Sequence, residues 1–304
     1  MLKKGEGPVK DKQLFITNIP AISAIYFSLL QCGYDFYSIE RDELTIEKLR
    51  GFIAPDHAEY GFFSEIKQHT CEVYPYWPRA SMLETASFYV DLSQKQFVDF
   101  DTYKDNILSA KNISDIERNQ LFWDWIIRFP EALKNVINSD SFCCYMKWER
   151  TWLEKQNQKN GKKLENIQKI LALCKEKYQS PICNIRIVLN PIKCVYSADY
   201  HRKDADFTFC SGKLSEESLI HEFLHHIVHP VIENREDEIL CYEFDSLKID
   251  ASYYLNHGEL GRLNAFEEYM VRELTDTVIR GNIPENLSVF FDQLIRTNHP
   301  SHKP

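Results

Sequence analysis

The sequence predicts an α+β fold that is predominantly helical and contains one small sheet. Three observations lead to this class. Most of the chain from Asn18 to Glu154 places apolar residues at helical spacing. Two later segments, Ile185–Leu189 and Asp206–Cys210, have the pattern of strands. Only 10 Gly and 12 Pro occur among 304 residues, which argues against a turn-rich all-β protein.

The composition is that of a globular protein. Apolar residues make up 44% and charged residues 27% of the 35.9 kDa chain, which has the size of one large domain or two ordinary ones. The formal net charge is −9 and the isoelectric point about 5.6. The chain has no basic surplus to neutralise phosphates, so we expect no nucleic-acid partner.

The cysteines predict a reducing compartment. There are nine of them, spread from Cys32 to Cys241, and no two have CxxC spacing. In a chain of this length an odd, scattered set is typical of reduced thiols, so we expect a cytoplasmic protein. The same pattern gives little support to a zinc site made of cysteines.

The apolar stretch from Leu14 to Cys32 predicts a buried helix rather than a secretion signal or membrane anchor. Its apolar part, from Ala21 to Leu30, is only about ten residues long, too short to cross a bilayer. Asn18 is a possible N-cap, Pro20 would lie in the first turn and Gly33 would end the helix. We therefore expect no membrane partner.

Four further segments of the N-terminal half are predicted as helices. The last two carry aromatic residues at helical spacing, which indicates core packing, although a peptide-binding cleft is an alternative. The segments are Thr45–Ile53, Phe62–His69, Ile116–Phe129 and Asp140–Glu154, and the aromatic set includes Trp123, Trp125, Trp148 and Trp152.

The polar run QNQKNGKK, from Gln156 to Lys163, is the clearest interruption of the chain. It predicts a long loop or a domain boundary. We therefore expect a helical N-terminal domain over residues 1–160 and a second domain over residues 161–304.

The pattern after this run is helix, strands and then several helices. Leu164–Tyr178 has helical spacing and precedes the two predicted strands. A helix over residues 215–229 follows, and we expect His229-Pro230 to end it. The remaining predicted helices cover Glu236–Tyr254, Leu260–Arg280 and Glu285–Arg296.

His221-Glu222-Phe223-Leu224-His225 is an HExxH motif. On a helix, residues four apart lie one turn apart on the same face, so two imidazoles can bind one Zn²⁺. Glu222 lies where its carboxylate can take a proton from a metal-bound water. Ser215 is a good N-cap, and the apolar residues around the motif have helical spacing, so the segment is predicted to be helical as the motif requires.

A third metal ligand has to come from elsewhere in the chain. The extended motif HExxHxxGxxH fails, because Val228 and Val231 occupy its Gly and His positions. His229 is too far along the helix from His221 to share its metal. Two later candidates, Glu267 and Glu268, lie on the helix predicted for residues 260–280. We favour Glu268, which shares a polar face with Arg272 and Thr275, and keep Glu267 as the alternative.

HExxH followed some tens of residues later by a helical Glu resembles the gluzincin branch of the zincin metallopeptidases. The order of predicted elements resembles a minimal version of that fold, and the segment around Glu268 resembles small, poorly characterised zinc peptidases. The resemblance covers residues 164–281 and leaves the N-terminal half uncovered. It implies a zincin-like second domain, in which the first helix backs the sheet and the strand before the HExxH helix, Asp206–Cys210, lies at the sheet edge.

The expected function is a zinc-dependent hydrolase, with a peptidase acting on a peptide or protein substrate as the expected class. His221, His225 and Glu268 would hold Zn²⁺, and Glu222 would act as general base. A carboxylate that orients a ligand imidazole and a donor to the oxyanion are also needed. Candidates for the carboxylate are Glu243, Asp245 and Asp250, and those for the donor are Tyr200, His201, Tyr253, Tyr254 and His257.

Two other functions remain open at this point. One is a binding or regulatory protein that keeps a zincin scaffold without turnover. The other is a metal-free helical interaction protein in which HExxH occurs by coincidence.

Overall fold

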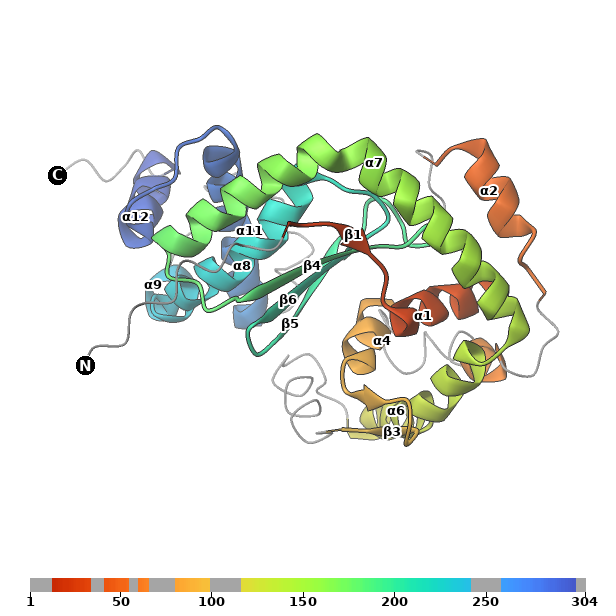
Figure 1. Ribbon diagram of the computed structural model, residues 1–304. Helices are drawn as coiled ribbons and strands as arrows, with labels where there is room; N and C mark the ends of the chain where they lie inside the picture. The colour runs from red at the N-terminus through yellow and green to blue at the C-terminus, as the bar shows by residue number, and fades with distance from the viewer. Residues whose placement is uncertain are drawn as a thin grey trace, which may run out of the picture.

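The computed structural model describes residues 13–33, 41–54, 60–65, 80–98, 116–241 and 258–298. Within these residues the chain forms helices on both sides of a small mixed sheet, with a separate two-stranded ribbon (Figure 1). The predicted α+β class is therefore confirmed. None of the described helices combines the length and apolarity that a membrane span requires.

The main sheet has the strand order β1-β4-β6-β5. Strands β4 (Asn184–Leu189) and β6 (Asp206–Ser211) were both predicted, whereas β1 (Ile16–Thr17) and β5 (Asp199–Lys203) were not. β1, β4 and β6 run parallel, and β5 is antiparallel to β6. The small ribbon pairs β2 (Val90–Asp91) with β3 (Gln96–Phe97).

The expectation that Asp206–Cys210 forms the sheet edge is wrong, because β5 lies outside it. β5 and β6 are joined by a two-residue turn at Asp204 and Ala205, with Lys203 paired to Asp206. Asp204 has a φ of 54°, a left-handed conformation that Asp adopts more readily than most residues. This turn folds β5 back along β6, so β5 is the edge strand.

The longest helix, α7 (Asp140–Lys177, 38 residues), corrects the prediction of a loop at Gln156–Lys163. Leu153 and Leu164 are both buried and lie three helical turns apart, so one face of α7 stays in the core across the polar run. Asn157, within the run, accepts a hydrogen bond from the Ile16 N–H and donates one to the Ile16 carbonyl, each at 2.8 Å. The run is polar because it is solvent-facing and holds the backbone of β1, not because the helix ends there.

In the described part of the chain, the core consists of two clusters of buried apolar side chains, one on each side of the sheet. The first contains α1 (Pro20–Gln31), α4 (Ala80–Ser87), α6 (Ile116–Ile137) and the start of α7. The second contains the rest of α7 with α8 (Glu216–Glu233) and α11 (Gly258–Ile279). In β4, Val188 joins the first cluster, while Ile187 and Leu189 join the second. α7 arches over both groups of helices (Figure 1). The division of the chain at residue 160 stays a prediction.

Most predicted helices are present with shifted bounds. α1 is buried along almost its whole length, with Pro20 in its first turn and Gly33 behind it, but its N-cap is Ile19 and not Asn18. Trp148 and Trp152 pack against the two clusters, in agreement with a core role, and the side chains of Trp123 and Trp125 lie outside the described residues. The other observed helices are α2 (Glu43–Arg50), α9 (Glu236–Leu240) and α12 (Leu287–Asn298), and a helical turn covers residues 61–65.

Two helix ends were predicted wrongly, and both lie at prolines. α6 continues past Phe129 through Pro130 to Ile137, and α8 continues past His229 through Pro230 to Glu233. Buried residues beyond each proline, Leu133 and Ile232, keep the following turns in the core. The prediction of a helix over Glu236–Tyr254 is met up to Leu240, and residues 242–257 lie outside the described part, as do residues 66–69 of the segment predicted at 62–69.

We expect Gly161→Ala to stabilise the protein by about 0.5–1 kcal/mol, because a Cβ at this helical position meets nothing within 4 Å. Urea unfolding would measure the change. Gly281→Ala is the control, since Gly281 has a φ of 86° and the substitution should destabilise by about 1 kcal/mol. A destabilising Gly161→Ala would contradict a continuous α7.

Candidate metal centre

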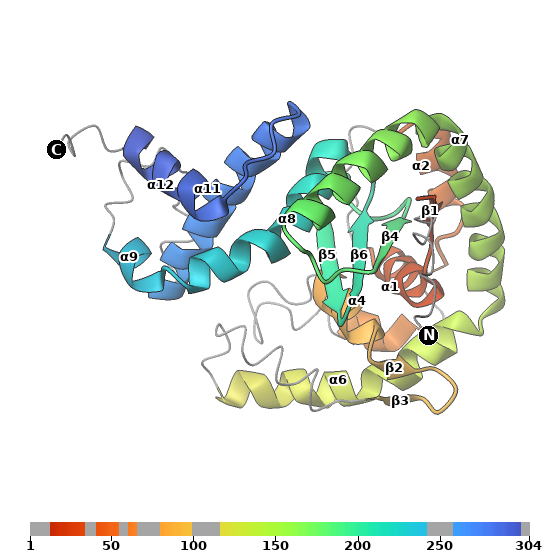
Figure 2. The same cartoon turned by 60° about the vertical axis from the view of Figure 1, so that its left-hand side comes forward.

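The structure brings the predicted residues His221, His225 and Glu268 together between α8 and α11. The Nε2 atoms of His221 and His225 lie 3.2 Å apart. Oε2 of Glu268 lies 3.4 Å from Nε2 of His221 and 3.5 Å from Nε2 of His225. All three side chains are mostly but not fully buried. Figure 2 shows α8 beside the sheet and α11 on the side of α8 that faces away from β5.

These three atoms fit the dimensions of a zinc site. A point equidistant from the three atoms lies about 1.9 Å from each, close to the bond lengths of about 2.0–2.2 Å that zinc forms with imidazole and carboxylate. Two imidazoles and one carboxylate are also the donor set of several catalytic zinc sites, which keep one position for water or substrate. The donor chemistry and spacing therefore suit Zn²⁺.

Each carboxylate of the Glu267-Glu268 pair has a different contact. Glu268 uses its second oxygen, Oε1, to accept a hydrogen bond from Nε of Arg272 at 2.8 Å, which leaves Oε2 facing the two histidines. Glu267 instead lies 2.8 Å from Nδ1 of His225, on the opposite edge of that imidazole. Burial raises the pKa of Glu268, but hydrogen bonds from His221 and His225 outweigh it and hold the pKa well below its usual range.

Sequence reasoning placed the carboxylate that orients an imidazole at Glu243, Asp245 or Asp250, all outside the described residues. Among the described residues, Glu267 has the contact that this role requires. Its side chain is largely buried against α8. The polar-face argument that separated the two glutamates could not reveal which edge of the imidazole each one meets.

Glu222 and Tyr200 complete the described surroundings of the centre. Burial raises the pKa of Glu222 in the metal-free protein to about 7. The ring of Tyr200, on β5, stacks on the imidazole of His225 with centroids 5.9 Å apart and planes 15° from parallel. Burial raises the pKa of Tyr200 well above its usual value, so its hydroxyl stays protonated and can donate.

Two other described histidines, His226 and His201, have their contacts away from the centre. His226 faces away from the centre, as its place on the helix predicts: its Nε2 lies 2.7 Å from the Ser180 hydroxyl and its Nδ1 contacts the Phe223 carbonyl. His201 cannot be the oxyanion donor, because successive residues of β5 point to opposite faces and His201 lies on the face away from Tyr200. Tyr253, Tyr254 and His257 lie outside the described residues.

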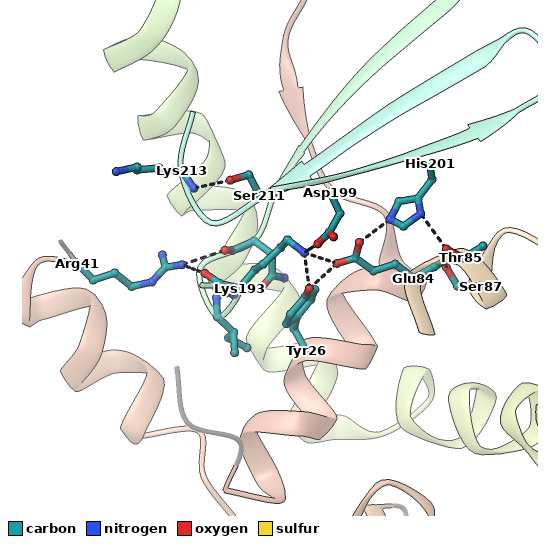
Figure 3. A network of polar contacts seen from close by, with 12 residues as sticks. Tyr26, Arg41, Glu84, Thr85, Ser87, Lys193, Asp199, His201, Ser211 and Lys213 are labelled. Atoms are coloured by element: carbon teal, nitrogen blue, oxygen red, sulfur yellow. Dashed lines mark hydrogen bonds and ion pairs between the residues drawn. The ribbon is translucent and has the colours of Figure 1, made fainter. Parts of the chain in front are cut away.

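A buried polar network lies on that other face of the sheet (Figure 3). The ammonium of Lys193 donates to Asp199 at 2.5 Å, Tyr26 at 2.8 Å and Glu84 at 3.0 Å, so all three of its N–H groups have acceptors. Glu84 also contacts Nε2 of His201 at 2.6 Å. Lys193 and Glu84 are almost fully buried.

Glu84, His201 and Cys210 lie close enough together to resemble a second metal site, but their chemistry does not fit one. Burial raises the pKa of the Cys210 thiol well above its usual value, which opposes the loss of its proton to a metal. The positive charge that balances Glu84 is already supplied by Lys193. This network is a closed set of ion pairs and hydrogen bonds.

Comparison of the chain with protein-family models, with curated proteins and with solved structures finds no match.

We expect Glu84→Gln to destabilise the protein by about 3–5 kcal/mol, because it leaves the buried Lys193 ammonium without its main counter-charge. The free energy of unfolding in urea would measure this loss. Lys95→Met is the matched control: it breaks the exposed Lys95–Glu131 pair and should cost less than about 1 kcal/mol. If both substitutions lowered the free energy of unfolding by the same amount, the buried network would contribute no more than an exposed ion pair.

Proposed function

We propose that this chain is a zinc-dependent hydrolase, and specifically a peptidase of the gluzincin type. The observation that carries the proposal is the convergence of three ligand atoms, from His221, His225 and Glu268, around one point. The helix that supplies the two histidines also bears Glu222. The donor set, its spacing and the neighbouring carboxylate are what metal-assisted hydrolysis of a carbonyl compound requires.

His221, His225 and Glu268 would hold the zinc ion. When bound, zinc lowers the pKa of a coordinated water and polarises a carbonyl group. Glu222 then has the role of proton carrier: its carboxylate accepts a proton from the attacking water and delivers it to the leaving amine.

Three side chains around the ligands would prepare them for the metal. Glu267 accepts from Nδ1 of His225, which leaves the Nε2 lone pair directed at the metal. Arg272 occupies one oxygen of Glu268 and leaves the other for coordination. Tyr200, stacked on His225, limits rotation of the ring and is the candidate oxyanion donor among the described residues.

The competing hypothesis is a zincin scaffold that binds a partner without turnover. The described residues offer Tyr200 alone as a candidate oxyanion donor, which favours this hypothesis, since a site that lacks this donor loses much of its catalytic power. Metal content and hydrolysis are therefore separate questions, and each has its own test.

The wild-type protein, purified without chelator or metal-affinity column, should contain about one zinc per chain, the stoichiometry of a site with three protein ligands. His221→Ala should contain none. Plasma mass spectrometry measures both. If neither protein holds zinc after reconstitution and dialysis, HExxH is a coincidence and the metal-free interaction protein is the better hypothesis.

Glu222→Gln should keep its zinc and lose hydrolysis of a diverse peptide library by at least about 10²-fold, the contribution expected of a general base. The amide is close in size to the carboxylate but cannot accept the proton. Unchanged turnover in this variant would exclude the mechanism. Zinc in the wild type without any cleavage would favour the non-catalytic binding protein.

A further inference from the structure

Glu267 joins two histidines of α8 through its two carboxylate oxygens. Oε1 lies 2.8 Å from Nδ1 of His225, and Oε2 lies 2.8 Å from Nδ1 of His229. The two histidines are four residues apart, so α8 places them one turn apart on one face. The carboxylate, from α11, therefore spans two successive turns of the facing helix.

The contact with His229 constrains Glu267 in a way that the contact with His225 alone does not. A glutamate side chain has three rotatable bonds, and one hydrogen bond leaves the carboxylate free to turn about its own axis. A second donor on the other oxygen fixes the plane of the carboxylate. Because the Glu267 side chain is only 13% exposed, little water reaches it to replace that donor.

His229 itself is not placed to bind the metal. Its Nδ1 faces Glu267, and its Nε2 lies 3.3 Å from Oε1 of Glu233, one turn further along α8. It is also the most exposed of these histidines, at 56%. Both ring nitrogens are thus engaged by carboxylates other than that of Glu268.

We propose that His229 is a positioning residue for the metal centre: it holds Glu267 in the orientation that directs Nε2 of His225 at the zinc ion. The inference rests on the proposed zinc site and adds a residue beyond the HExxH motif to it. His229 acts through Glu267 and His225, and it contacts neither the metal nor the substrate.

The proposal assigns the effect to one nitrogen of His229, which permits a sharp comparison. The side-chain amide of Asn places its nitrogen near the position of Nδ1, whereas the amide of Gln places it near Nε2. His229→Asn should therefore preserve the donor to Glu267, and His229→Gln should not. Glu233→Gln is the matched control, because it alters only the other contact of His229.

The zinc dissociation constants of the full-length variants would be measured by competition with a chromophoric chelator, with Zn²⁺ alone as the probe. His229→Ala and His229→Gln should bind zinc about tenfold more weakly than wild type, the lower end of the range for residues behind a metal ligand. His229→Asn and Glu233→Gln should bind within about twofold of wild type on the same scale. The visible spectrum of the Co²⁺-loaded proteins reports the ligand geometry. It should change in His229→Ala and His229→Gln only.

Equal zinc affinity in wild type and His229→Ala would overturn the proposal while leaving the zinc site intact. Equal weakening in His229→Asn and His229→Ala would also overturn it, since the donor to Glu267 would then be irrelevant. Absence of zinc binding in the wild type would instead remove the proposed function, and this inference with it. Thermal unfolding of the metal-free variants is the control for a general loss of structure. We expect similar unfolding temperatures in all of them, because the His229 side chain is largely exposed.

Discussion

The ammonium of Lys193 is the contact on which the arrangement of β5 depends. A buried charge is tolerated only when its donors are satisfied and its charge is balanced, and Lys193 meets both conditions through Tyr26 on α1, Glu84 on α4 and Asp199 on β5. These partners come from three elements far apart in the chain. The network therefore fixes the edge strand to the N-terminal helices as well as to β6.

The alternation of residues along β5 carries this constraint to the opposite face of the sheet. Asp199 and His201 belong to the polar network, and Tyr200 between them points the other way, onto His225. One strand of five residues is thus held by the helices of the first core cluster and forms part of the wall around the candidate metal centre. In this arrangement the N-terminal half helps to shape the site even though all three candidate ligands lie in the C-terminal half.

Features that follow from local spacing could be predicted from the sequence, and those that depend on distant partners could not. The HExxH helix and its Ser215 cap follow from nearby residues, and Ser215 indeed accepts a hydrogen bond from the Ser218 N–H. Glu268 could be favoured over Glu267 as the third ligand but not assigned, because helix periodicity indicates the face on which a residue lies and not the residue that it contacts. β1 is too short to show a period, and the polar run in α7 resembles a loop unless its contact with β1 is known. The buried network around Lys193 could not be predicted from the sequence, because the hydrogen-bond acceptors of Lys193 come from residues 26, 84 and 199.

The pairing of β1 with distant residues has a consequence for how the chain folds during synthesis. Ile16 is held by Asn157, which follows it by 141 residues, and its strand partner β4 comes later still. A strand of two residues has too few contacts to persist alone, so on a ribosome it must wait until most of the polypeptide has emerged. A fragment that begins after Gln156–Lys163 would also lack this strand and leave the backbone of β4 uncovered, inviting association between copies. A cut at the polar run would therefore separate β4 from the strand that covers its edge.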